Sequence, residues 1–102
     1  MKSFLEDENT AVFTTKFVMK DRELITYVTH EIEDGAWQFY SESEFNGYED
    51  IMVVSLKNII ELDETITKIA DLPLGFAAFR KTKTEEWKIE QLWRPPANSR
   101  HD

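Results

Sequence analysis

The pattern of hydrophobic and polar positions predicts strands at both ends of the chain and short helices between them. Residues 11–19 are rich in β-branched and aromatic side chains and are expected to form a first strand, and residues 24–32 a second. The charged residues 20–23 separate these runs, so we expect the two strands to form a hairpin. Asp34-Gly35 is another hairpin turn signal, because glycine tolerates positive φ angles.

The third predicted strand follows this turn and alternates in character. Trp37 and Phe39 point to one face, while Gln38 and Tyr40 point to the other. Large rings dominate the interiors of small domains, so Trp37 and Phe39 are expected in the core. The polar residues 41–50 then predict a loop.

Residues 51–56 are apolar on both faces, which is typical of a strand in the middle of a sheet. Ser55 and Asp63 are placed to cap two short helices, because their side chains can accept hydrogen bonds from exposed backbone N–H groups. Leu72-Pro73 ends the helical region, since proline disfavours helix in the residue before it.

The remaining apolar runs predict a fifth strand at residues 75–81 and a sixth at residues 87–92. Strands followed by helices and then by strands indicate the α+β class. We expect a mainly antiparallel sheet of about five to six strands, with one or two short helices between the fourth and fifth strands. The expected organisation is a flexible acidic leader (1–10), a single α+β domain (11–92) and a flexible tail (93–102).

Composition agrees with one small folded domain. The chain has 102 residues, of which 41% are hydrophobic, too many for intrinsic disorder. It has no cysteine, which excludes a disulfide framework and a thiolate metal site. Residues 1–10 lack the apolar run of a signal peptide, and no stretch reaches the ~20 apolar residues of a membrane span. We expect a cytoplasmic protein.

The net charge of −8 lies entirely in the first half of the chain, where residues 1–50 carry 4 basic and 12 acidic groups. A negative field repels phosphate backbones and anionic lipid, so nucleic acid and membranes are not expected partners. The field would instead attract a basic partner. Arg80, Lys81 and Lys83 form the only basic concentration and are interpreted as the solvated end of a hairpin.

The search for catalytic chemistry gives no motif. His30 lies near several carboxylates, but no second histidine is close in sequence, so it is interpreted as an edge histidine with an ordinary hydrogen bond. Serine lacks a nucleophile elbow, and the three glycines are isolated. We therefore expect no enzyme activity, no cofactor and no metal.

An acidic and aromatic stretch remains as the candidate partner-binding surface. Interfaces favour aromatic rings, and carboxylates at their rims speed association with cationic partners. The alternative is a solvated loop with one or two rings folded back on the sheet. The candidate residues are Tyr40, Glu42, Glu44, Phe45, Tyr48, Glu49 and Asp50.

Four blocks along residues 11–90 resemble the bacterial immunity protein 33-like family, long catalogued as a domain of unknown function. They are Asp34-Gly35-Ala36-Trp37-Gln38-Phe39, Ser55-Leu56-Lys57-Asn58-Ile59-Ile60, Asp63-Glu64-Thr65-Ile66 and Leu72-Pro73-Leu74-Gly75-Phe76-Ala77-Ala78-Phe79-Arg80. The resemblance implies a binding role, since the family is predicted to neutralise toxins in bacterial conflict systems. It carries over no catalytic residues, and the matched residues look structural.

The leading hypothesis is a non-enzymatic protein-binding module, specifically an immunity protein that occludes a basic toxin through its acidic and aromatic surface. The alternative is a housekeeping or regulatory domain with a small-ligand pocket between helices and sheet. An enzyme using His30 is a third hypothesis. The sequence does not decide between monomer and dimer.

Overall fold

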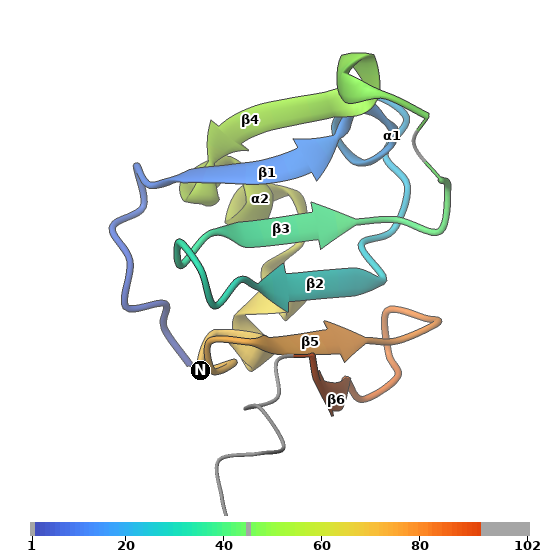
Figure 1. Cartoon of the computed structure of the whole chain (residues 1–102). Coiled ribbons are helices and arrows are strands. Elements are labelled where there is room, and N and C mark those ends of the chain that lie inside the picture. The colour runs from blue at the N-terminus through green and yellow to red at the C-terminus, as the bar shows by residue number, and fades with distance from the viewer. Residues whose placement is uncertain (1, 45, 93–102) are drawn as a thin grey trace, which may run out of the picture.

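Six strands form one sheet, and short helices cover one face of it (Figure 1). The computed structural model describes residues 2–44 and 46–92. The strands are β1 (Ala11–Thr15), β2 (Tyr27–His30), β3 (Trp37–Tyr40), β4 (Ile51–Ser55), β5 (Phe76–Phe79) and β6 (Lys88–Gln91). The α-helices are α1 (Lys16–Met19) and α2 (Leu56–Leu62), and the 3₁₀ helices are η1 (Tyr48–Asp50) and η2 (Glu64–Ile69).

The strand order is β4-β1-β3-β2-β5-β6. Every neighbouring pair is antiparallel except β1 and β3, which are parallel, with Phe13 opposite Gln38. The fold is thus α+β with a mostly antiparallel sheet, and α2 and η2 lie between the fourth and fifth strands, as predicted.

The predicted hairpin between the first two strands is wrong, because the first strand ends early. The Thr15 side chain accepts a hydrogen bond from the backbone N–H of Val18 at 3.3 Å and thereby caps α1. Residues 16–19 are therefore helical instead of extended. Arg22 then takes a positive φ of 59°, and β2 enters the sheet on the far side of β3.

The Asp34-Gly35 turn is confirmed, and it joins β2 to β3. Gly35 has a φ of 74°, its N–H donates to the Glu31 carbonyl at 3.0 Å, and the Asp34 carboxylate accepts from the Ala36 N–H at 2.9 Å. The hairpin brings Trp37 opposite His30.

The central position predicted for residues 51–56 is also wrong, because β4 is an edge strand. Its two apolar faces have different environments. Val54 packs against the core, whereas Val53 on the other face is 59% exposed. A strand with apolar residues on both faces therefore does not need a neighbouring strand on each of its two edges.

The core lies between the sheet and the helices and includes Trp37 and Phe39, as predicted. Ser55 caps α2 by accepting from the Asn58 N–H, and Asp63 caps η2 by accepting from the Thr65 N–H, so both predicted caps are confirmed. The fully buried aliphatic side chains around the two rings are Val12, Val18, Ile25, Val28, Leu56, Ile59 and Ile66.

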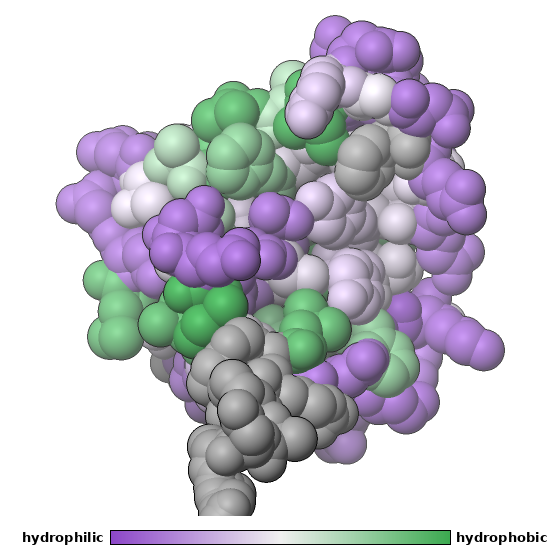
Figure 2. Space-filling model, viewed as in Figure 1, coloured by the Kyte–Doolittle hydropathy of each residue, from purple (hydrophilic) through white to green (hydrophobic). Residues whose placement is uncertain are grey.

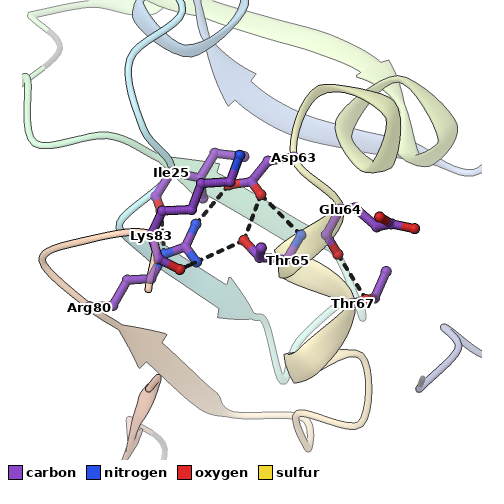
Figure 3. Close-up of polar contacts among 7 residues, drawn as sticks. All are labelled: Ile25, Asp63, Glu64, Thr65, Thr67, Arg80 and Lys83. Carbon is purple, nitrogen blue, oxygen red and sulfur yellow. Dashed lines mark hydrogen bonds and ion pairs between the residues drawn. The ribbon is translucent and has the colours of Figure 1, made fainter. Parts of the chain in front are cut away.

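Arg80 at the end of β5 is buried, so its interpretation as part of a solvated hairpin end is wrong, while Lys81 and Lys83 are exposed. Its guanidinium donates to the Asp63 carboxylate at 2.7 Å, to the Thr65 hydroxyl at 2.8 Å and to the Ile25 carbonyl at 3.0 Å (Figure 3). Charge pairing and several hydrogen bonds offset the cost of burying this cation.

The segment before β1 contacts the domain at several points. The Phe4 ring packs edge-on against Trp37 with centroids 5.0 Å apart, and the Glu8 carbonyl accepts from the Lys57 N–H at 2.9 Å. Lys2 forms a surface ion pair with Asp71. The predicted tail at 93–102 lies outside the described residues.

Candidate functional site

Within residues 2–44 and 46–92, one face of the sheet has no helical layer over it. In Figure 1, α2 and η2 lie behind the strands, and the viewer looks at the opposite face. Successive residues of a strand point to opposite faces, so the strands that bury Val12, Val28 and Phe39 present their other residues here. This open face contains Phe13, Tyr27, Thr29, Gln38, Tyr40, Val53, Ala77, Phe79 and Glu90.

Three aromatic residues form a row across the open face. Tyr40 of β3 lies opposite Tyr27 of β2, which lies opposite Phe79 of β5. The two tyrosine rings have centroids 6.4 Å apart, and Phe79 is 36% exposed. We call Tyr40, Tyr27 and Phe79 the aromatic row.

A second row crosses all six strands beside the aromatic row. It runs Val53, Phe13, Gln38, Thr29, Ala77 and Glu90 in sheet order. Its β4–β1 end is apolar and solvent-accessible, since Val53 is 59% and Phe13 36% exposed. Figure 2 shows this apolar surface in green over β4 and β1, with further green surface near β5 and paler surface between them.

Carboxylates border the tyrosine hydroxyls. Burial raises the pKa of Tyr27 above its ordinary value, and the charges of Glu90 and Glu31 raise it further. Burial likewise raises the pKa of Tyr40, with a smaller contribution from Glu31. Both hydroxyls therefore stay protonated at neutral pH, and Tyr40 donates to the Gln38 amide oxygen at 2.5 Å.

The acidic loop, residues 41–50, begins at the aromatic row, because it follows Tyr40 directly. Its first part is tied down by Ser41 and Ser43, whose hydroxyls donate to the Glu23 carboxylate at 2.7 and 3.0 Å. These two bonds hold the pKa of Glu23 below its ordinary value. The loop is thus fastened next to the open face.

The other end of the loop is held by Asp50. Its carboxylate accepts from the Asn46 N–H at 3.0 Å and pairs with the Lys16 ammonium at 2.9 Å. The hydrogen bond from Asn46 and then the one from Lys16 keep the pKa of Asp50 low. Asp50 is only 5% exposed, so it anchors the loop and offers no surface to a partner.

The other candidate residues have different environments. Glu42, Glu44 and Glu49 are exposed, and Tyr48 is 94% exposed. Tyr40 is half-buried in the aromatic row. Phe45 lies outside the described residues. Three carboxylates and one ring of the predicted surface therefore face solvent.

The candidate surface predicted from the sequence did not include Phe13, Tyr27, Val53 or Phe79. Strand alternation predicts that the side chains of Phe13 and Val12 point to opposite faces of the sheet, but it does not predict which of the two faces the helices cover. The small number of predicted helical residues could have indicated that one face of the sheet stays uncovered. Two short helices can cover only one face of a six-stranded sheet.

His30 lies in the interior of the sheet and not at an edge, because β2 is flanked by β3 and β5. Its Nδ1 lies 2.7 Å from the Leu72 carbonyl, and its ring stacks on Trp37 with centroids 4.0 Å apart. Nε2 is 3.7 Å from the Glu6 carboxylate. The predicted ordinary hydrogen bond is confirmed, and the ring serves to join β2 to the turn after η2.

A groove of about 1200 Å³ lies between η2 and the β5–β6 hairpin, in the region where the alternative hypothesis expects a small-ligand pocket. Trp87 and Ile89 contribute apolar surface. Several polar groups of the lining are already used within the chain: Lys2 pairs with Asp71, and Thr65 bonds Asp63. The lining thus combines apolar side chains with charged ones around an open groove.

Across residues 2–44 and 46–92, no group of three or more acidic or histidine side chains is arranged to hold a metal ion. In the same residues no helix is long and apolar enough to cross a membrane. Comparisons of the chain with protein-family models, with curated proteins and with solved structures found no match.

Proposed function

We propose that this chain is a non-enzymatic protein-binding module whose contact surface is the open face together with the acidic loop. The observation that supports it is that the acidic loop, with exposed Glu42 and Glu44, directly follows Tyr40 of the aromatic row. Rings provide buried contact area at low rotamer cost, and carboxylates at the rim select a cationic partner. The expected partner is a basic protein.

Charge and shape both support a macromolecular partner. The second row crosses all six strands and the aromatic row crosses three of them, which gives a broad surface of the kind protein interfaces have, with Thr29 and Ala77 buried in its middle. Small ligands instead need a concave site. The net charge of −8 would raise the association rate with a cationic protein and make it depend on salt.

The specific form of this proposal is a cytoplasmic immunity protein that occludes a basic toxin. Support for it comes from the four sequence blocks that resemble the immunity protein 33-like family. Binding by occlusion needs no catalytic group on this chain, and it needs a rigid surface such as a sheet.

The test begins with affinity capture from a lysate of the native host at low and high salt, followed by calorimetry with the purified partner. Glu42→Lys with Glu44→Lys should weaken binding at least about tenfold and reduce its salt dependence. Phe79→Ala should weaken binding about tenfold at both salt concentrations, because it removes apolar contact area.

The control is Glu61→Lys, which makes the same substitution as each of the two loop changes, at an exposed position of α2 behind the sheet. It should leave affinity unchanged. If Glu61→Lys weakens binding while the loop and aromatic-row variants do not, the proposed surface is wrong. If the partner binds at the predicted surface but is not a toxin that the chain protects cells against, binding stands and the immunity role fails.

A further inference from the structure

The two edges of the sheet differ in a way that concerns self-association. Proteins protect edge strands from pairing with other chains by means of charged residues, proline or bulges. The edge strand β6 carries Lys88 and Glu90. The edge strand β4, with the sequence IMVVS, has no charge and no proline, and it pairs all five residues with β1 in unbroken register.

The outward-facing backbone groups of β4 follow from its pairing with β1. The Leu56 N–H donates to the Thr10 carbonyl, which lies one step before the register pair Ala11–Ser55. In an antiparallel ladder the hydrogen-bonded pairs alternate, so Met52 and Val54 bond β1. Ile51, Val53 and Ser55 therefore direct their N–H and C=O groups away from the sheet.

Two of these six groups already have partners within the chain. The Ile51 N–H donates to the Tyr48 carbonyl at the end of η1. The Ser55 carbonyl accepts the first helical bond of α2, because Ser55 is the N-cap residue. The Ile51 C=O, both groups of Val53 and the Ser55 N–H remain directed outward at the edge.

We infer that β4 pairs antiparallel with β4 of a second copy of this chain, centred on Val53. In this register the two Val53 residues exchange both of their hydrogen bonds, and each Ser55 N–H donates to the Ile51 carbonyl of the other copy. The groups without a place in this ladder, the Ile51 N–H and the Ser55 C=O, are those already bonded within their own chain. No outward group of the strand is left unpaired.

Side chains match in the same register. The two Val53 side chains meet on the open face, where each is 59% exposed in one chain alone. Two residues beyond the ends of β4 lie exposed Glu49, in η1, and exposed Lys57, in α2. The twofold pairing brings the η1 end of one copy to the α2 end of the other, so opposite charges come near each other at both ends of the paired strands.

The pairing would join two sheets into one of twelve strands with both open faces on the same side, because directly opposite residues of an antiparallel pair share a face. This inference does not depend on the partner-binding function. Lys57 and the backbone of β4 lie outside the acidic loop and the aromatic row, whereas Glu49 belongs to the loop, so Lys57→Glu is the variant that leaves the proposed partner surface unchanged.

The experiment is a charge swap measured by sedimentation velocity over a wide range of protein concentration. Glu49→Lys alone and Lys57→Glu alone should each weaken dimerisation about tenfold, since each places like charges together twice. The double variant should restore the affinity of the natural chain. Glu61→Lys, exposed on α2, should leave dimerisation unchanged.

Hydrogen exchange provides the second measurement on the natural chain. The amides of Val53 and Ser55 should exchange fast in dilute solution and slowly at concentrations where the dimer forms, while those of Met52 and Val54 stay protected at both. A chain that sediments as a monomer up to millimolar concentration would overturn the inference. So would a dimer in which Val53 and Ser55 gain no protection, or one that the charge swap does not restore.

Discussion

Arg80 joins three parts of the molecule through one guanidinium group. It directly follows β5, donates to the Asp63 carboxylate at the start of η2 in an ion pair, and donates to the Ile25 carbonyl in the segment before β2. It also stacks over the Trp87 ring at 4.1 Å, next to β6. A planar group with five donors can make these contacts at once, and an ammonium cannot.

We expect Arg80→Lys to destabilise the protein by about 3 kcal/mol, because Asp63 would keep its buried charge without the forked donor that matches it. Urea denaturation measures this. Lys81→Ala, which changes the adjacent exposed cation, should shift the free energy of unfolding by less than about 0.5 kcal/mol. Equal effects of the two substitutions would show that the network contributes little.

The same pair makes stability depend on pH. Burial alone would raise the pKa of Asp63, but hydrogen bonds from Thr65 and the charge of Arg80 outweigh it and hold that pKa below its ordinary value. A carboxyl group with a lowered folded-state pKa stabilises the fold above its unfolded pKa, and this contribution is lost as pH falls through the folded value.

The free energy of unfolding of the natural chain should therefore decrease as pH falls below about 4, and that of Asp63→Asn should decrease less. Denaturation at a series of pH values gives the two curves. Glu23 and Asp50 also have lowered pKa values, so some acid sensitivity should remain in the variant. Parallel curves would mean that Asp63 does not contribute.

At the scale of elements, three side chains decide where strands end and helices begin. Thr15, Ser55 and Asp63 each cap the helix that follows them. In two of these cases the capping residue is also the last residue of a strand, so the chain passes from strand to helix without a loop. The cap fixes the direction in which the chain leaves the sheet.

Ser55→Ala should destabilise the protein by about 1 kcal/mol, because the Asn58 N–H loses its acceptor. Thermal and urea unfolding measure the change. Asn58→Ala on the same helix keeps the cap and improves helix propensity, so it should be neutral or stabilising. A neutral Ser55→Ala would indicate that water replaces the cap at no cost.

Elements were predictable where the signal is local. The Asp34-Gly35 turn, the caps at Ser55 and Asp63, and the core positions of Trp37 and Phe39 follow from residues near each other in sequence. The pairing of strands could not be predicted in this way. β1 pairs with β3 and β4 and not with β2, the next strand in the sequence, and the periodicity of a strand contains no information about which strand it pairs with.

At the scale of the whole molecule, one helical layer explains the open face. α2 and η2 are enough to cover one side of the sheet, and the rings on the other side remain partly exposed. The candidate surface could be predicted only in part for this reason. The acidic loop is contiguous in sequence, but the aromatic row combines residues from β2, β3 and β5, and only the register brings them together.

The position of β1 between β3 and β4 also has a consequence during synthesis. Ribosomes add about 5–20 residues per second and release the N-terminal part first. Val12 pairs with Val54, which is synthesised several seconds later. During that time at least one edge of β1 has no strand to pair with. A chaperone that binds exposed apolar segments would find residues 11–15 of the nascent chain accessible throughout that interval.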